Sequence, residues 1–183
     1  MEEKERMLKG ELYSPNKSSI LLNEMKRAKE LCFKYNSIDL YSEIKNEIIE
    51  ELFGHIGKGF HIEPYFWCDY GYNIFAGENL YINHNCVILD GARVEFGDNV
   101  FVAPNCGFYT AGHPINIDER NSGLEYAKPI KIGNNVWIGG NVVVLPGVTI
   151  GDNVTIGAGS VVNKDIPSNV VAVGNPCKVC KEL

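Results

Sequence analysis

A period of six residues governs the hydrophobic positions in the last third of the chain. Branched aliphatic residues occupy every sixth position there, and glycine follows four of them. The aliphatic positions are Ile132, Ile138, Val144, Ile150, Ile156 and Val162. A period of six matches neither an α-helix, at about 3.6 residues, nor the alternation of a β-strand. The pattern therefore predicts a repeat in which each unit turns a corner.

The same period starts earlier, in frames that shift twice by two residues. The runs are Ile62, Cys68 and Ile74, then Ala76, Ile82, Ile88 and Val94, then Phe96, Val102 and Phe108. A shift of two keeps the inward face of a strand inward, so extra residues can sit at a corner without inverting the core. Residues 109–129 break the period with two glycines and two prolines among polar residues, which predicts a protruding loop.

Each hexad supplies one short strand and one corner. A small residue stands two places before each later aliphatic, at Val136, Val142, Val148, Val154 and Ser160. Segments such as Gly133-Asn134-Asn135 provide residues that tolerate a positive φ at the corner. Three hexads close a triangular coil of about eighteen residues, and stacked coils pair their strands in parallel around a column of aliphatics. The expected fold is mainly β, a parallel β-helix.

The first 57 residues predict a helical segment instead. Apolar residues recur at three- and four-residue intervals after Ser18 and Ser19, which are expected N-caps. The two stripes are Leu21, Leu22, Met25, Ala28, Leu31, Cys32 and Tyr35, then Leu40, Ile44, Ile48, Ile49, Leu52 and Phe53. Gly54 and Gly57 favour an end to the second helix. The division is a helical segment at 1–57 and a β-helix domain at 58–183, with the loop at 109–129 and a C-terminal tail.

Composition narrows the class of protein. A chain of 183 residues with 45% hydrophobic residues can bury one sizeable core. A net charge of −6 argues against an extended surface for nucleic acid or anionic membrane. No signal peptide or apolar span is evident, so we expect a cytoplasmic protein. Cys177 and Cys180 form a C-x-x-C pair without a second ligand pair, which favours packing as apolar residues over a zinc or redox site.

Several segments of the sequence resemble motifs of one protein family. They are GELY near the N-terminus, CDYGYNI (68–74), GDNVFVAPN (97–105), AGHP (111–114), IGNNVWIGG (132–140) and VVNKDIPSNVVAVGNPCKV (161–179). They are similar to the maltose and galactoside O-acetyltransferases of the hexapeptide-repeat acyltransferases. The resemblance implies a left-handed parallel β-helix and acetyl transfer from acetyl-CoA to a sugar hydroxyl, with maltose, glucose or a galactoside as acceptor. It also implies a homotrimer with active sites between subunits.

The resemblance assigns catalytic residues by position. His113 in AGHP matches the family's catalytic histidine, and imidazole can accept the hydroxyl proton near neutral pH. Asn83 matches a position that contributes to acetyl-CoA binding and the reacting centre. The Gly140 N–H matches the oxyanion donor. A turn asparagine at 83 and a plain corner glycine at 140 remain the alternatives.

The resemblance also places both substrates. Coenzyme contacts fall on Asn83, Gly140, Ala158, Asn163, Lys164, Lys178 and Lys181, and Trp137 is expected along the pantetheine or acceptor, or packed at the subunit interface. Asp69 matches a sugar-binding position. Asp90 is a second sugar-binding candidate, although the family can carry its acidic group at the next position, here Gly91. Ser14-Pro15-Asn16 departs from the aspartate of some relatives, so the acceptor site can differ.

Three alternatives remain open on the sequence. The β-helix can be a non-catalytic scaffold or sugar-binding module, because fold alone does not fix function. An acetyltransferase can also take a different acceptor, such as an amine. A metal-dependent hydratase would need converging histidines, and His55, His61 and His84 lack a recognisable ligand spacing. We therefore expect no metal.

Overall fold

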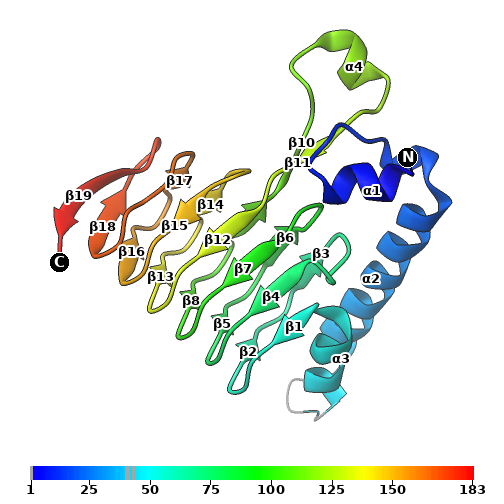
Figure 1. Cartoon of the computed structure of the whole chain (residues 1–183). Coiled ribbons are helices and arrows are strands. Elements are labelled where there is room, and N and C mark those ends of the chain that lie inside the picture. Colours follow the sequence, from blue (N-terminus) through cyan, green and yellow to red (C-terminus); the bar gives the residue numbers. More distant parts are fainter. Residues whose placement is uncertain (1, 40–41, 43) are drawn as a thin grey trace.

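A computed structural model describes residues 2–39, 42 and 44–183 and shows a three-sided prism of short strands (Figure 1). The first sheet holds β1 (His55–Ile56), β4 (Ile74–Ala76), β7 (Val94–Phe96), β12 (Ile130–Ile132) and β15 (Thr149–Ile150). The second holds β2 (His61–Ile62), β5 (Tyr81–Ile82), β8 (Phe101–Val102), β13 (Trp137–Ile138), β16 (Val154–Ile156), β18 (Val170–Val173) and β19 (Lys178–Glu182). The third holds β3 (Phe66–Cys68), β6 (Cys86–Leu89), β9 (Gly107–Tyr109), β14 (Val143–Val144) and β17 (Val161–Val162).

The chain visits the three sheets in turn, which confirms the predicted parallel β-helix. Strands of successive coils pair in parallel, and Trp137 lies beside Thr155, eighteen residues further on. Ile132, Ile138, Val144, Ile150, Ile156 and Val162 are all at most 1% exposed. The small residues two places earlier, such as Val136 and Ser160, are buried as well. Each hexad therefore contributes two inward side chains to the column, one on the strand and one just before it or at its start.

The three edges of the prism differ in length and composition. Between the first and second sheets run corners rich in asparagine, which we call the asparagine edge (residues 77–80, 97–100, 133–136 and 151–153). Between the second and third sheets lies the glycine edge (residues 83–85, 103–106, 139–142 and 157–160). Between the third and first sheets lies the loop edge (residues 69–73, 90–93, 110–129, 145–148 and 163–165).

The two frame shifts of the sequence are counted within β4, from Ile74 to Ala76, and within β7, from Val94 to Phe96, and the extra residues are accommodated at the adjoining loop edge. Cys68 on β3 is followed by five residues before Ile74 on β4, and the coils there advance by twenty residues, from Tyr81 to Phe101. The inward residues on both sides of each shift stay buried. The longest corner, residues 110–129, leaves the prism at this same edge (Figure 1).

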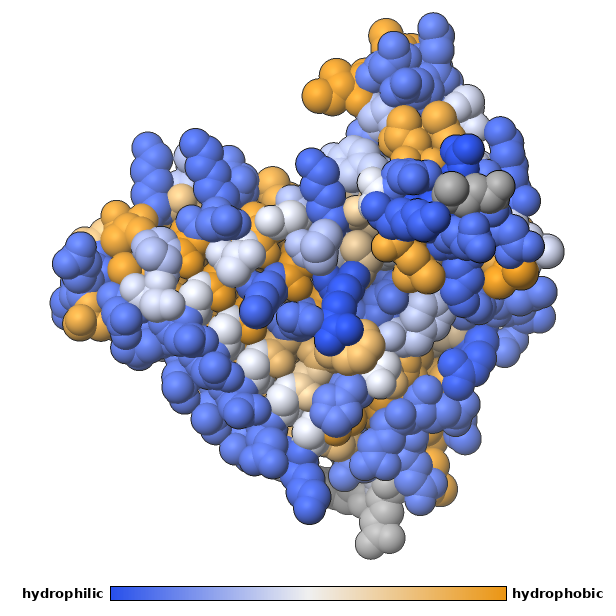
Figure 2. Space-filling view, in the orientation of Figure 1, coloured by the Kyte–Doolittle hydropathy of each residue, from blue (hydrophilic) through white to orange (hydrophobic). Residues whose placement is uncertain are grey.

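At the asparagine edge, both the backbone angles and the side-chain hydrogen bonds repeat from coil to coil. Asn135 and Asn153 have φ values of 55° and 53°, as expected from their place after glycine. Amide side chains stack from coil to coil, with Asn99 Nδ2 donating to Asn135 Oδ1 at 3.2 Å. Figure 2 shows this edge as a hydrophilic border along the lower left of the prism.

Helices cover the N-terminal end of the prism (Figure 1). They are α1 (Glu3–Leu8), the short 3-10 helix η1 (Pro15–Lys17), α2 (Ser19–Ser37) and α3 (Ile44–Leu52). The Ser18 side chain accepts from the Leu21 N–H, which confirms that N-cap. Leu21, Ala28, Cys32 and Tyr35 of α2 are buried, as are Ile48, Ile49 and Leu52 of α3. Two members of the predicted stripes, Leu22 and Ile44, are exposed, and Leu40 lies outside the described residues.

The tail returns to the second sheet. β18 pairs in parallel with β16, and β19 then runs antiparallel to β18. Cys177 is buried as an apolar side chain, whereas Cys180 is exposed, and both are free thiols. None of the helices in the described part of the chain has the length and hydropathy needed to cross a bilayer.

Ile132→Ala should lower the free energy of unfolding by about 2–5 kcal/mol, because it opens a cavity between coils. Its neighbour Lys131 points outward from the same strand, so Lys131→Ala is the matched control and should cost less than about 0.5 kcal/mol. Urea denaturation of both variants at one protein concentration measures the difference. Equal losses would contradict the assigned inward face.

Candidate active site

His113 stands at the base of the protruding loop. The strands β10 (Ala111–Gly112) and β11 (Tyr126–Ala127) pair antiparallel there, and α4 (Ile117–Asn121) lies at the far end (Figure 1). The exposed His113 ring places Nδ1 at 3.1 Å from the Leu124 carbonyl oxygen. Because a carbonyl only accepts, Nδ1 carries the proton in this bond and Nε2 keeps its lone pair. The exposed side of the ring can therefore accept a proton.

The N-terminal segment holds the loop strand that orients His113. Tyr13 N–H donates to the Glu125 carbonyl at 3.0 Å, and Glu125 N–H donates back to the Tyr13 carbonyl at 2.8 Å. The Tyr13 hydroxyl also donates to Glu125 Oε2 at 3.3 Å. Sequence reasoning missed both residues. The only sequence signal for Tyr13 is the GELY segment, which matches the family pattern but does not indicate what Tyr13 contacts.

Asp69 lies on the same edge with its carboxylate unengaged. No hydrogen bond from the described residues reaches its side-chain oxygens, and the residue is partly exposed. Burial raises the pKa of Asp69, while the ammonium of Lys29 acts in the opposite direction and Glu125 adds to the rise. A partly buried carboxylate whose oxygens are not already hydrogen-bonded can accept hydrogen bonds from two neighbouring sugar hydroxyls.

Asp90 does not face a substrate, and its prediction as a sugar ligand is wrong. The residue is 0% exposed. Its Oδ1 accepts from the N–H groups of Asp69 and Tyr70, at 3.0 and 2.8 Å. Its carbonyl accepts from Asn73 Nδ2 at 2.7 Å. The extra residues of the corner create backbone donors that need an internal acceptor, and Asp90 supplies it.

The glycine edge carries the second group of expected site residues. Asn83 Oδ1 accepts from the His84 N–H at 2.7 Å, so the turn role of this asparagine is present, and its Nδ2 remains a donor. The Gly140 carbonyl accepts from Gly159 N–H at 2.8 Å. Among the described residues, nothing accepts a hydrogen bond from the Gly140 N–H. Ala158 is exposed one coil further on.

The remaining coenzyme candidates lie on three parts of the prism. Trp137, 57% exposed, continues a row of outward aromatic rings on the second sheet, after His61, Tyr81 and Phe101. Asn163 and Lys164 are exposed at the loop edge. Lys178 and Lys181 are exposed on β19, at the end of the second sheet. Sequence reasoning missed the aromatic row because its members are spaced by whole coils.

One chain does not bring all of these residues together. The loop edge holds Asp69, His113 and Lys164, whereas the glycine edge holds Asn83 and Gly140. The third sheet separates the two edges. Its outward residues Trp67, Val87, Val143 and Val161 are all apolar and are not fully buried.

Two family models match the chain. The bacterial transferase hexapeptide model, of six repeats, matches residues 129–164, and the maltose acetyltransferase hexapeptide capping motif matches residues 6–57. A maltose O-acetyltransferase from Clostridium difficile 630 has a structure with a TM-score of 0.98 and 52% identity, covering 100% of this chain and 98% of that one. The chain belongs to the maltose and galactoside O-acetyltransferases.

Two further solved structures that resemble this chain contain a coenzyme. A galactoside acetyltransferase in complex with coenzyme A is 44% identical, with a TM-score of 0.94 and coverage of 100% of this chain and 91% of that one. The hexapeptide-repeat acetyltransferase VCA0836 of Vibrio cholerae O1 biovar eltor, complexed with acetyl coenzyme A, is 38% identical, with a TM-score of 0.92 and coverage of 100% and 99%. The β-helix of this family is left-handed, as expected from the resemblance.

The histidines outside the loop do not assemble a metal centre. His61 Nε2 and His84 Nδ1 lie 3.0 and 4.0 Å from the two carboxylate oxygens of Glu63, while His55 is on another sheet. In the part of the chain that the structure describes, no group of three or more histidine, cysteine or acidic side chains could hold a metal ion.

Asp90→Asn should change how stability varies with pH. Burial raises the pKa of Asp90 to about 6, so the folded chain holds this proton more tightly than the unfolded chain does. The resulting stabilisation is full below pH about 4 and is lost as the pH rises through about 6. The variant cannot ionise, so relative to the unchanged chain it should gain up to about 3 kcal/mol between pH 4 and pH 7.

Urea denaturation of the unsubstituted protein and of the variant at each pH gives the difference between their free energies of unfolding. The contributions of the other carboxylates are common to both proteins and cancel in this difference. A difference that stays constant, or that moves in favour of the unchanged chain as the pH rises, would rule out a buried acid that gains a proton on folding.

Proposed function

We propose that this protein transfers the acetyl group of acetyl-CoA to a hydroxyl of a sugar such as maltose, glucose or a galactoside. The observation that carries the proposal is the oriented His113 ring, whose Nδ1 donates to the Leu124 carbonyl and whose Nε2 has no hydrogen-bond partner among the described residues. The family supports the choice of co-substrate, because one relative was solved with coenzyme A and another with acetyl coenzyme A.

The proposed reaction uses Nε2 of His113 as the general base. Nε2 of His113 takes the hydroxyl proton as the sugar oxygen attacks the thioester carbonyl carbon. The N–H of Gly140 donates to the oxyanion that forms, and glycine allows the thioester to approach the backbone. The protonated imidazole then returns the proton to the coenzyme A sulfur as the C–S bond breaks. The products are the acetylated sugar and free coenzyme A, and no cysteine nucleophile is needed.

The sugar and the coenzyme have separate places in this proposal. Asp69 accepts hydrogen bonds from the hydroxyls of the sugar, on the same edge as His113. Lys164, Lys178 and Lys181 provide positive charge for the phosphates, with Asn163, Ala158 and Trp137 as further contacts. Asn83 binds the coenzyme beside the reacting centre.

We further propose a homotrimer in which each active site lies between two subunits. The loop edge of one subunit would then face the glycine edge of the next, across the apolar third sheet. The loop tip supports this arrangement, because Ile115 is 94% exposed and Ile117 is 63% exposed. Figure 2 shows hydrophobic side chains among the polar ones at the top of the protruding loop. Two large apolar side chains exposed near each other at a loop tip suit a contact with a neighbouring subunit.

His113→Ala should lower kcat by about 10²–10⁴-fold, since it removes the general base. The affinity for acetyl-CoA should stay within about twofold, because the ring contacts the hydroxyl rather than the coenzyme. Release of the coenzyme thiol across maltose, glucose and galactosides measures turnover, and calorimetry measures acetyl-CoA binding. His55→Ala, an exposed histidine on the first sheet, is the matched control.

Unchanged turnover in His113→Ala would contradict the role of His113 as general base. An unchanged chain that releases no thiol with any sugar of the panel would defeat the proposed function and favour a non-catalytic module or a different acceptor.

Mixing two inactive variants tests the shared site. His113→Ala and Asn83→Ala should each be inactive alone, because each removes one half of every site. Trimers refolded from an equal mixture should recover about one quarter of the native activity, since a quarter of the sites pair an intact His113 with an intact Asn83. Sites built within one chain would show no recovery in the same thiol-release assay.

A further inference from the structure

Two buried thiols meet where helix α2 packs against strand β3. Cys32 lies on α2 and Cys68 on β3, and their Sγ atoms are 3.7 Å apart. The residues are 0% and 3% exposed, and both thiols are free. The proposed reaction uses neither of them. Cys68 also occupies an inward position that the repeat fills with a branched aliphatic in most other coils, so packing alone does not require a thiol there.

Hydrogen bonds hold α2 and β3 in one register around these thiols. Asn36, one turn after Cys32, donates from Nδ2 to the Phe66 carbonyl at 2.9 Å and accepts from the Phe66 N–H at 2.9 Å. Phe66 and Cys68 are two residues apart and both point to the buried side of their strand. The folded chain therefore keeps Cys32 and Cys68 opposite each other.

The two thiols differ in how readily they ionise. The hydrogen bond from Cys68 lowers the pKa of Cys32, while burial acts in the opposite direction. The same hydrogen bond, together with burial, raises the pKa of Cys68. Because the thiolate is the nucleophilic form of cysteine, Cys32 is the side chain that reacts first with an oxidant. Cys68 lies in place to react with the product.

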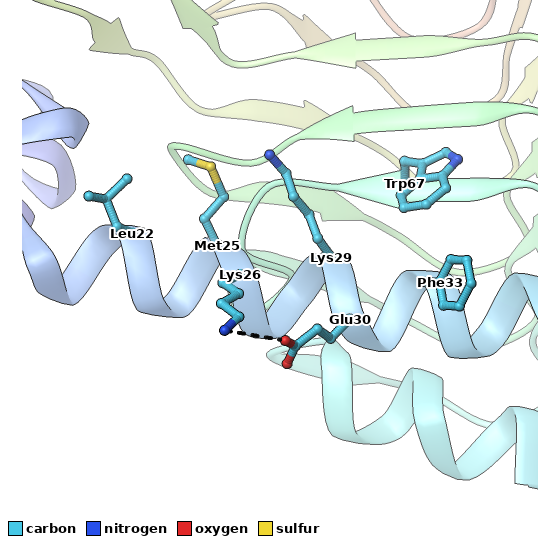
Figure 3. Close-up of a pocket in the computed structure, with 7 residues that line it drawn as sticks. All are labelled: Leu22, Met25, Lys26, Lys29, Glu30, Phe33 and Trp67. Atoms are coloured by element: carbon cyan, nitrogen blue, oxygen red, sulfur yellow. Dashed lines mark ion pairs between the residues drawn. The ribbon is translucent and has the colours of Figure 1, made fainter.

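Helix α2 also reaches the carboxylate that we assign to the sugar. Asp69 follows Cys68 directly in the chain, and Lys29 precedes Cys32 by three residues on α2. Figure 3 shows Lys29 extending from α2 toward the strands. Burial raises the pKa of the Asp69 carboxyl, and the charge of Lys29 acts against this rise. The separation of α2 from β3 therefore sets how strongly Lys29 competes with a sugar for Asp69.

The thiol pair lies just beneath the outer side of α2. Figure 3 shows Phe33 of α2 beside Trp67 of β3, and these residues are the chain neighbours of Cys32 and Cys68. Trp67 is on the third sheet, which is assigned above to the contact between subunits. Phe33 is 66% exposed, so the open approach to the thiols is from the helix side. Transient opening of α2 from β3 then admits a small oxidant.

We infer that Cys32 and Cys68 are a site of reversible oxidation, at which a disulfide weakens sugar binding by Asp69. The oxidant is a peroxide. The Cys32 sulfur attacks one peroxide oxygen, the O–O bond breaks, and the departing hydroxide takes the thiol proton and leaves as water. The Cys68 sulfur then attacks the sulfenic acid, and the hydroxyl leaves with the Cys68 proton as a second water. Both sulfur atoms are oxidised, and the peroxide is reduced.

The disulfide acts on Asp69 through the helix. Sulfur atoms that lie 3.7 Å apart must come within bonding distance. Side-chain rotation takes up part of this change, and the approach of α2 to the end of β3 takes up the rest. Lys29 then lies closer to Asp69 and occupies the oxygens that the sugar needs. This effect rests on the proposed function, because it presupposes that Asp69 binds the acceptor.

Treatment of the full chain with hydrogen peroxide tests the inference. Mass spectrometry of the digest without reductant should find the Cys32 and Cys68 peptides joined. In the thiol-release assay, KM for the sugar that the reduced protein uses best should rise at least about threefold, since small displacements of a positioning group are costly. The affinity for acetyl-CoA, measured by calorimetry, should stay within about twofold, because none of its proposed contacts is on α2 or β3. Dithiothreitol should restore the KM of the reduced protein.

Substitutions of single cysteines separate this pair from the other thiols. Cys32→Ser and Cys68→Ser should each prevent the cross-link and make KM insensitive to peroxide. They lie on different elements, so failure of one variant to fold leaves the other as a test. Cys86→Ser removes a buried thiol whose Sγ donates to the Ala103 carbonyl at 3.5 Å, and Cys180→Ser removes the exposed thiol. These two controls should keep both the cross-link and the change in KM.

The other results would contradict either the inference or the proposed function. The inference is overturned if Cys32 and Cys68 do not cross-link, if the cross-link leaves KM unchanged, or if KM still changes in both serine variants. Reduced protein that releases no thiol with any sugar is instead failure of the proposed function. Calorimetry with the same sugars then compares reduced and oxidised protein without turnover, and equal affinities overturn the inference as well.

Discussion

The inward column of branched aliphatic side chains is the constraint on which the rest of the molecule depends. Each strand is so short that it presents only one or two residues to the column, and parallel pairing fixes how successive coils stack. Insertions can enter only at corners, and only in numbers that keep the inward side inward. The extra residues gather at one edge, where the corner at 69–73 and the loop at 110–129 both lie.

That edge is also where polar groups become available for chemistry. Longer corners contain backbone donors that the parallel ladders cannot satisfy, and Asp90 is buried to satisfy them. Asp69 is left with a free carboxylate as a result. The loop strand then receives Tyr13 as an extra partner, and the Leu124 carbonyl becomes fixed enough to orient His113. The regular coils make the prism rigid, and the irregular loop edge carries the side chains of Asp69 and His113.

The sequence predicted the repeat well because its period acts on every coil. The aliphatic positions, both frame shifts and the protruding loop follow from counting alone. The contacts of the irregular parts did not. Nothing in the sequence separates a buried Asp90 from an accessible Asp69, since both occupy turns. The spacing of apolar residues does not separate Leu21, which is buried, from Leu22, which is exposed, because both belong to the same predicted stripe. Glu125 was missed because its partner Tyr13 is more than a hundred residues away.

The reversed strand β19 ends the prism with an open row of backbone groups. An uncovered strand of this kind invites pairing with other chains unless charges discourage it. All of its side chains are exposed, and they include Lys178, Lys181 and Glu182. The lysines proposed to meet phosphates thus also keep the coils from joining end to end. Substituting them for the sake of ligand binding alone would leave this edge more prone to pair with the same edge of a second copy of the chain.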